Sequence, residues 1–359
     1  MIPMRVGIFF VGGKMEKTSI CVLFGGKSGE HEVSLRSAYS VLEAIDESKY
    51  IIHKIGITRD GEWYLFKGDN RLILEGKWQT EGENTPICVD FCQKHLLVGG
   101  ENLCPDIVFP VLHGAFGEDG RIQALLELLE IPYIGCNSAS SALCMDKALC
   151  KGVAMQSFVP VVPYVVVTER EYKSNTYECD LEGDVFVKPS SSGSSLGISR
   201  ARGAEQIECA LGVALRHSPT ALVERAIEGA ECEVAVTEIK GKAVASEVGQ
   251  ISYKADFYDY ETKYHSSAVK YKIPAKISRE CRNLCKKYAL DMFYALGCSG
   301  LCRMDFFVTR DEEIYFNEVN TLPGFTSGSM YPMLLKRQGY DMTALVDLLV
   351  GEALRRKEG

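Results

Sequence analysis

The chain has 359 residues, of which 46% are hydrophobic and 25% charged, and its formal net charge is −8. This composition is typical of a folded globular protein and excludes disordered and fibrous classes. The acidic balance argues against general binding to nucleic acids or anionic membranes, and no stretch reaches the ~20 apolar residues of a membrane span. We therefore expect no nucleic-acid partner and no membrane association.

Strands and helices alternate in the first third of the chain. We interpret residues 1–17 as an extension ahead of the first domain, because Met15 lies just before the first clear apolar run. Strands are expected at 20–24, 51–58, 63–66, 107–110 and 132–135, and helices at 34–45 and 121–129. This alternation predicts a doubly wound α/β domain over residues 18–136.

The remaining chain is expected to form two α+β regions, 137–235 and 236–359. The first has a helical stretch at 138–157 and strands at 164–168, 185–188, 221–225 and 232–239. The second has a helix at 278–296, a strand at 302–308, a hairpin to 314–319 and a closing helix at 342–356. Residues 250–272 are rich in aromatic side chains but show neither helical nor strand periodicity, which predicts a lid loop.

Two glycine-containing turns follow apolar runs in the first domain. Gly26-Lys27-Ser28 resembles the end of a P-loop, but Cys21 stands where that motif needs glycine, so the P-loop interpretation fails. What remains is a turn leading into a helix N-terminus, where Glu32 can either favour the helix dipole or bind an ammonium group. The second turn, from His113 to Gly120, is either an ordinary βα turn or a ligand-binding loop.

A serine-rich loop follows the expected strand at 185–188. Lys188 is followed by five serines and two glycines up to Gly197. Backbone amides, hydroxyl groups and a lysine are the donors of a phosphate cradle. We favour that interpretation over a flexible linker, because linkers seldom begin at the end of a strand.

The strongest pattern lies in the last hairpin. Arg303 and Asp305 are two residues apart on one strand, as Glu318 and Asn320 are on the next, so each pair shares a face. Clustered carboxylate and amide oxygens suit Mg²⁺ held partly by substrate phosphates. A surface cluster of ion pairs is the alternative.

The fourteen cysteines are scattered along the chain, and we interpret them as reduced thiols of a cytoplasmic protein. Two pairs, Cys281 with Cys285 and Cys298 with Cys302, have a spacing that suggests zinc. The first pair has helical spacing and the second flanks a glycine turn. Burial as small apolar side chains is therefore the better explanation.

Together these motifs resemble the D-alanine–D-alanine ligase family of ATP-grasp carboxylate–amine ligases. The resemblance runs from Lys17 to the C-terminus and rests on seven motifs in the family's order. They begin at Phe24, His113, Met145, Lys188, Phe257, Arg303 and Asn317. It implies an ATP-grasp fold, α/β and α+β, with an N-terminal doubly wound domain and two α+β subdomains that enclose ATP.

The resemblance also implies roles for individual residues. The catalytic set is Glu32, Ser194, Tyr264, Arg303 and Gly324. Substrate would contact His113, Ser329 and Met330. ATP would contact Lys147, Lys188, Ser195, Glu224, Arg225, Ile227, Glu231 and Lys263. Two Mg²⁺ (or Mn²⁺) ions would be held by Asp305, Glu318 and Asn320.

The implied reaction joins two D-alanines through an acyl phosphate for peptidoglycan synthesis, in a cytoplasmic homodimer. A D-alanine–D-serine ligase and a catalytically silent ATP-grasp protein are the alternatives. Tyr264 in the expected lid resembles dipeptide-forming members, and the apolar Met330 resembles D-alanine users. With ATP, metals and substrates bound, the charges of the expected site nearly cancel, so we expect a cation-rich pocket in their absence.

Overall fold

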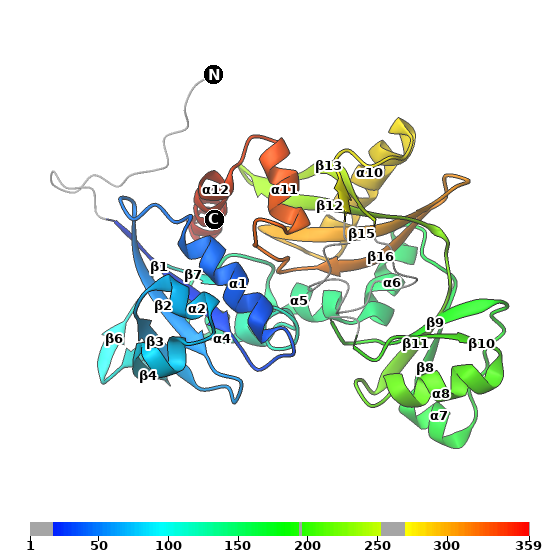
Figure 1. Ribbon diagram of the computed structural model, residues 1–359, viewed down its shortest axis with the longest axis horizontal. Coiled ribbons are helices and arrows are strands. Elements are labelled where there is room, and N and C mark those ends of the chain that lie inside the picture. The colour runs from blue at the N-terminus through cyan, green and yellow to red at the C-terminus, as the bar shows by residue number, and fades with distance from the viewer. Residues whose placement is uncertain (1–16, 194–195, 253–269, 359) are drawn as a thin grey trace.

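The structure is a computed structural model that describes residues 17–193, 196–252 and 270–358. Its strands form three sheets that follow one another along the chain (Figure 1). The first sheet has seven strands, the second four and the third five. In Figure 1 the seven-stranded and four-stranded sheets lie on opposite sides of the five-stranded sheet and of the helices α5 (Ser138–Met145) and α6 (Lys147–Gln156).

The seven-stranded sheet is parallel only at one end. β1 (Thr18–Gly25) pairs in parallel with β2 (Tyr50–Ile57) and β7 (Ile107–Pro110). The sheet continues antiparallel beyond β2 through β3 (Trp63–Lys67), β4 (Glu83–Asp90), β5 (His95–Val98) and β6 (Glu101–Leu103). The short helices α2 (Asn70–Leu74) and α3 (Trp78–Glu81) lie between β3 and β4 in sequence.

Helices cover both faces of β1, as a doubly wound arrangement requires. Ile20, Val22 and Phe24 face α1 (His31–Leu42), whereas Cys21 and Leu23 face α4 (Arg121–Leu128). Because successive strand residues point to opposite faces, an all-apolar strand buried on both sides is the expected outcome. The α/β prediction is confirmed, although residues 132–135 contribute only an isolated bridge between Tyr133 and Val108 instead of a strand.

The four-stranded sheet is antiparallel, in the order β10-β9-β11-β8. Its strands are β8 (Tyr164–Thr168), β9 (Asp184–Pro189), β10 (Ser199–Arg202) and β11 (Thr220–Arg225). Helices α7 (Glu169–Ser174) and α8 (Ala204–Ala214) accompany it. α8 buries Ile207, Ala210 and Leu211 in a core shared with Val185, Val187 and Val223 of the sheet.

The five-stranded sheet is also antiparallel, in the order β14-β13-β12-β15-β16. Its strands are β12 (Gly229–Ile239), β13 (Lys242–Ser252), β14 (Lys270–Lys272), β15 (Leu301–Thr309) and β16 (Ile314–Asn320). β13 ends where the expected lid begins and β14 lies where it ends, and these two strands pair with each other. Residues 253–269 of the lid lie outside the described part of the chain. Residue 235, the expected subdomain boundary, falls inside β12, so we propose a boundary before Gly229 instead.

The two faces of this sheet pack against different helices. Val234, Met304 and Phe306 share a core with α10 (Arg279–Ala295), α5 and α6. On the opposite face, Ala235 belongs to a core with α11 (Met330–Arg337), α12 (Met342–Glu358) and the first sheet. The rings of Phe109 and Phe325, 5.2 Å apart and edge to face, join the N-terminal domain to the segment after β16.

The expected helix at 138–157 is two helices. Asp146 ends α5 with an extended backbone and caps α6, where its carboxylate accepts hydrogen bonds from the amides of Ala148 and Leu149. A side chain that caps a helix N-terminus satisfies amides that have no partner within the helix. The break turns Lys147, the first residue of α6, toward the serine-rich loop.

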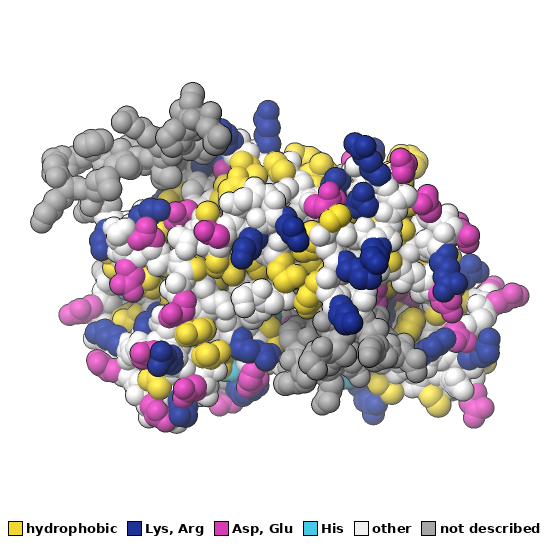
Figure 2. Space-filling model, turned by 45° about the horizontal axis from the view of Figure 1, so that its top comes forward, with side chains coloured by type: hydrophobic (Ala, Val, Ile, Leu, Met, Phe, Trp, Pro, Cys, Tyr) yellow, Lys and Arg dark blue, Asp and Glu magenta, His cyan; other side chains and the backbone are white. Residues whose placement is uncertain are grey.

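All fourteen cysteines are free thiols. Cys281, Cys285, Cys298 and Cys302 are buried in the core around α10, which supports their interpretation as small apolar side chains. No helix in the described ranges is long and apolar enough to cross a bilayer. On the face shown in Figure 2, Lys and Arg side chains are interspersed with Asp and Glu.

Candidate active site

The predicted hairpin of β15 and β16 presents its polar residues as expected. Asp305 lies opposite Glu318, and Arg303 opposite Asn320. The flanking Met304 and Phe306 point into the core on the other face, so strand alternation leaves the polar side chains together. Arg303 donates two hydrogen bonds to Asp305, from Nε at 2.8 Å and from Nη2 at 2.7 Å.

The structure adds Glu233, a residue that the sequence analysis did not select. β12 pairs with β15 so that Glu233 lies opposite Asp305, and Glu233 Oε1 is 3.3 Å from Arg303 Nε. Burial disfavours the charge of Arg303, but Asp305 and Glu233 outweigh it and raise the pKa of the guanidinium. Arg303 is therefore a permanent, buried cation held from two strands.

Lys147 joins the hairpin to the serine-rich loop. Its Nζ donates a hydrogen bond to the carbonyl oxygen of Ser192 at 2.8 Å and lies 3.2 Å from Glu318 Oε2. The loop is also tied to the start of α6, because Asp146 accepts hydrogen bonds from the hydroxyls of Ser190 and Ser191. The loop and Lys147 thus lie beside the carboxylate of Glu318.

A second ion-pair group lies where β9, β11 and α6 meet. Glu224 is buried between two lysines, with Oε2 2.8 Å from Lys188 Nζ and Oε1 3.3 Å from Lys151 Nζ. Burial acts to raise the pKa of Glu224, but the two lysine charges outweigh it and lower that pKa. Lys188 Nζ also lies 3.4 Å from Asn317 Oδ1, next to Glu318, so the two groups adjoin.

These contacts balance the charges of the described part of the pocket, which was expected to be cation-rich. Lys147, Lys151, Lys188 and Arg303 are matched by Glu224, Glu233, Asp305 and Glu318. Four positive and four negative side chains are thus in ion-pair contact among the residues that the structure describes. The expected count also included Lys263, which lies outside the described residues, and it did not include Lys151, Glu224 and Glu233.

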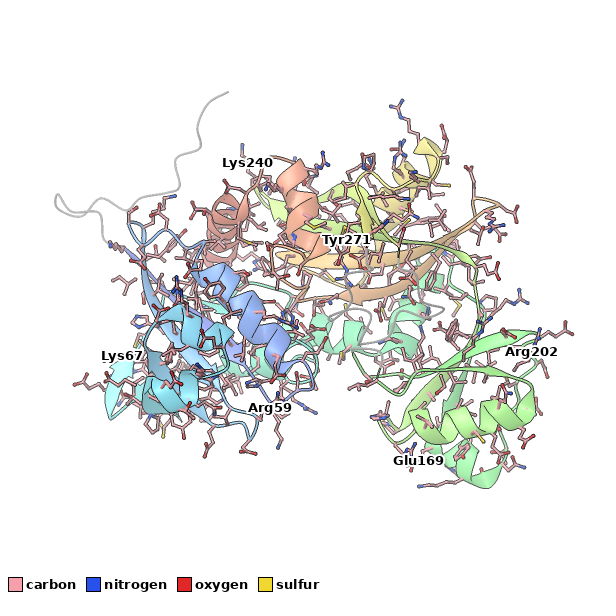
Figure 3. All side chains as sticks on the ribbon, viewed as in Figure 1. Arg59, Lys67, Glu169, Arg202, Lys240 and Tyr271 are labelled. Carbon is pink, nitrogen blue, oxygen red and sulfur yellow. The ribbon has the colours of Figure 1, made fainter. Side chains whose placement is uncertain are left out.

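Glu32 and His113 lie at the edge of the N-terminal domain. Glu32, in the first turn of α1, forms an ion pair with Arg59, and both side chains are more than half exposed. Figure 3 shows Arg59 in the loop beside α1. His113 is buried, with Nε2 2.9 Å from Ser37 Oγ and Nδ1 3.0 Å from the carbonyl oxygen of Leu322. Its ring therefore connects the N-terminal domain to the segment after β16.

That segment carries the remaining expected substrate contacts. Ser329 Oγ accepts a hydrogen bond from the amide of Thr326 and approaches Gly324 so closely that a Cβ there would lie 2.8 Å from it. The amide of Gly324 donates no hydrogen bond within the described chain. Met330 is only 3% exposed and packs on Gly249 in β13, so it belongs to the core and not to an open surface.

Three further expected ATP contacts surround the start of β12. Arg225 is exposed at the end of β11, Ile227 is half-buried in the connection, and Glu231 is half-buried on β12. Ser194, Ser195, Lys263 and Tyr264 lie outside the described residues. The sequence could not indicate Lys151, Glu233 or Arg59, because each pairs with a residue distant along the chain.

The oxygen atoms of the hairpin suit a hard cation. Asp305 and Glu318 are directly opposed carboxylates, and Asn320 adds an amide oxygen from the same face. Asn320 Oδ1 accepts a hydrogen bond of 3.2 Å from the amide of Leu322, which orients it. Carboxylate and amide oxygens are the ligands that Mg²⁺ prefers, so this donor set fits the metal site expected from the sequence.

The chain is similar to known proteins over most of its length. The chain matches family models described as the D-ala D-ala ligase N-terminus, over residues 19–136, and C-terminus, over residues 153–351. D-alanine–D-alanine ligase B of Clostridium tetani is 40% identical, over 99% of this chain and 100% of that protein. D-alanine–D-alanine ligase of Clostridium novyi is 42% identical, over 95% of this chain and 99% of that protein.

Solved structures give the same result. VanG D-Ala:D-Ser ligase from Enterococcus faecalis superposes with a TM-score of 0.87 at 38% identity, over 94% of this chain and all of that chain. The D-alanine-D-alanine ligase from Coxiella burnetii has a TM-score of 0.83 at 33% identity, over 96% and 95% of the two chains. The chain therefore has the ATP-grasp fold and belongs to the D-alanine–D-alanine ligase family.

Proposed function

We propose that this protein is an ATP-dependent ligase that joins two D-alanines for peptidoglycan synthesis. The observation that carries the proposal is the β15–β16 hairpin, where Arg303, Asp305, Glu318 and Asn320 share one face beside Lys147. In the reaction, ATP phosphorylates the carboxylate of the first D-alanine. The amine of the second D-alanine attacks this acyl phosphate and displaces phosphate, which leaves the dipeptide and ADP.

The lysines of the site are the proposed phosphate ligands. Lys147 and Lys188 would leave Glu318 and Glu224 for the triphosphate, and Lys263 and Ser195 would join them. Glu224 and Glu231 would accept hydrogen bonds from the adenine amino group and the ribose hydroxyls, with Arg225 and Ile227 beside the base. The existing ion pairs support these roles, because both lysine side chains lie against carboxylates of the proposed site.

Arg303 and the Gly324 amide are the proposed donors to the oxyanion that forms when the amine attacks. Arg303 is held by two carboxylates, and the Gly324 amide is not engaged in another described hydrogen bond. Donors that are already oriented stabilise developing negative charge without reorganising, which is often the largest catalytic contribution.

Asp305, Glu318 and Asn320 would hold two Mg²⁺ or Mn²⁺ ions. When bound, such ions neutralise phosphate oxygens and polarise the group that is transferred. In this state the residues of the chain would exchange partners: Lys147 would turn from Glu318 to phosphate, and Arg303 would keep Glu233 as a partner.

The N-terminal domain and the segment after β16 would bind the amino acids. Glu32 would receive the first ammonium group, and Ser194 and Tyr264 would link it to the lid. His113 would lie beside the first substrate, and Ser329 would bind the second carboxylate. Glu32 is exposed and paired with the cation Arg59 here, so its carboxylate is ionised and accessible.

D-Alanine is the proposed second substrate, and D-serine is the alternative that VanG D-Ala:D-Ser ligase raises. An apolar pocket rejects a substrate with an added hydroxyl only weakly, by roughly 100-fold at best, so an apolar residue such as Met330 would not by itself exclude D-serine. Mass spectrometry of the products from equimolar D-alanine and D-serine decides between them. A mixed dipeptide as the main product would contradict the D-alanine assignment.

The activity itself is tested by phosphate release and dipeptide formation from ATP and D-alanine. Arg303→Ala should bind ATP but lose turnover, because it removes an oxyanion donor. A protein that binds ATP yet forms no dipeptide with any D-amino acid would instead be a silent ATP-grasp protein. A cytoplasmic location and a homodimer complete the proposal, and the mass of the particle in solution tests the dimer.

A further inference from the structure

Lys151 is a buried charge to which the proposed mechanism gives no role. It lies on α6, one turn after Lys147, and its side chain is 0% exposed. Its Nζ is 3.3 Å from Glu224 Oε1 on β11 and 3.5 Å from the carbonyl oxygen of Phe316 on β16. Lysine is almost never fully buried unless its charge is paired, so this position calls for an explanation.

The carboxylate of Glu224 has two unlike sides. Oε2 is 2.8 Å from Lys188, whereas Oε1 accepts no hydrogen bond from the described residues and has only the Lys151 ion pair. Glu224 itself is 3% exposed. A carboxylate buried this deeply stays ionised only while cations compensate it.

Nucleotide binding would remove one of these two cations. The proposed function moves Lys188 to the triphosphate, and the 2.8 Å contact with Oε2 is then lost or shared. Lys151 cannot follow, because its ammonium group is enclosed between β11 and β16, the strands of two different sheets. After the exchange, Lys151 is the described cation that remains with Glu224.

We infer that Lys151 is a positioning residue that keeps Glu224 ionised and oriented toward the purine, and thereby sets the preference for adenine. This inference rests on the proposed function, since it takes Glu224 as the acceptor for the adenine amino group. An ionised carboxylate accepts a hydrogen bond from an amino group and repels a carbonyl oxygen. A protonated one donates to a carbonyl, so the charge of Glu224 determines which base is bound.

Lys151→Met tests this, with inosine triphosphate as the probe, because its base has a carbonyl oxygen in place of the amino group. Dissociation constants for ATP and inosine triphosphate are measured by calorimetry, and KM for D-alanine by phosphate release. We expect the preference for ATP to fall about tenfold, the size of one charge-assisted hydrogen bond, with KM for D-alanine unchanged. An unchanged ATP to inosine triphosphate ratio would overturn the inference.

A double-mutant cycle with Glu224→Gln separates positioning from packing. In the Glu224→Gln background no carboxylate needs to be kept ionised, so Lys151→Met should no longer alter the nucleotide ratio. An equal change in both backgrounds would show that Lys151 acts through packing and would contradict the inference. Should Lys151→Met not fold, Lys151→Gln, which keeps a hydrogen-bond donor but not the charge, replaces it in the same cycle.

Lys173→Met is the matched control, because it removes a lysine that pairs with Glu169 on exposed α7. Figure 3 shows Glu169 at the outer edge of the same subdomain. This variant should bind both nucleotides as the wild type does. If the wild type binds ATP but forms no dipeptide, the proposed function fails while the binding comparison still tests Lys151.

Discussion

Replacing Glu233 by Gln tests whether Arg303 must be held from two strands. Glu233 Oε1 lies 3.3 Å from Arg303 Nε, and Asp305 accepts the two shorter hydrogen bonds at 2.8 and 2.7 Å. In the proposed mechanism Asp305 turns to a metal ion, so the guanidinium depends more on Glu233 during turnover than in the free protein. Glutamine keeps the shape and an acceptor oxygen but removes the charge.

The expected size follows from the type of contact. A hydrogen bond to a charged group contributes about 1.5–3 kcal/mol, and a neutral acceptor retains part of that. A loss of transition-state stabilisation near the lower end of this range, ~1.4 kcal/mol, corresponds to a tenfold change in rate. We therefore expect kcat to fall about tenfold. KM for ATP should change little, because the buried Glu233 contacts the oxyanion donor and not the proposed nucleotide ligands.

Steady-state phosphate release at saturating D-alanine and ATP measures this effect. Glu228→Gln, an exposed glutamate in the connection between β11 and β12, is the matched control and should keep wild-type kcat. Thermal unfolding of both variants shows whether the fold is intact. A folded Glu233→Gln variant with wild-type kcat, or one whose only change is in KM for ATP, would refute the role of Glu233.

Four further predictions concern stability and metals. Gly56→Ala should lower the free energy of unfolding by ~1–3 kcal/mol, because a Cβ there would lie 2.4 Å from the buried ring of Trp78. Gly152→Ala, within α6 and with no atom within 4 Å of its Cβ, should instead raise it by ~0.4–1 kcal/mol; urea titrations measure both. Burial acts to raise the pKa of Glu127, but hydrogen bonds from Ser138 and a tyrosine outweigh it and lower that pKa. Glu127→Gln should therefore lower the free energy of unfolding by its full amount at pH values above the pKa of an unfolded glutamate, ~4.3, and by less as the pH falls through the lower pKa of the folded protein. Equal losses of unfolding free energy at pH 7 and pH 3 would contradict this. Chelation of divalent ions should abolish dipeptide formation, and Mg²⁺ or Mn²⁺ should restore it; activity that persists in excess chelator would contradict the metal assignment.

The sequence predicted those features of the site that depend on local periodicity. Arg303 and Asp305 share a face because strand side chains alternate, and the short connection to β16 makes Glu318 a neighbour. Continuous apolar runs predicted the buried strands of the first domain, β1 and β7. The antiparallel strands β4, β5 and β6 were missed, because their exposed and half-buried residues show no strong apolar pattern.

What the sequence could not indicate was the choice of charge partners. Glu233 meets Arg303 only because β12 pairs with β15 in one register, and a shift of one residue would place it in the α10 core. Lys151 has the helical spacing of a core residue in α6, and only the packing of α6 across two sheets brings it to Glu224. Glu32 likewise meets Arg59 through the parallel pairing of β1 and β2.

The pairing of charges changes how variants of this site should be interpreted. Each of the four cations already has a carboxylate partner, so removing Lys147 or Arg303 leaves a buried or half-buried carboxylate without that cation even when no nucleotide is present, and removing Lys188 or Lys151 leaves Glu224 with one lysine instead of two. Leaving a buried charge unpaired costs about 3–5 kcal/mol, more than most contacts with a ligand contribute. A fall in ATP affinity after a single substitution therefore combines two effects, the loss of contacts with ATP and the destabilisation of the nucleotide-free protein. Substituting Lys147 together with Glu318 removes both charges of a pair, and the difference from the single variants isolates the contribution to binding. Glu224 is shared by Lys188 and Lys151, so substituting Lys188 together with Glu224 would leave Lys151 as the unpaired buried charge.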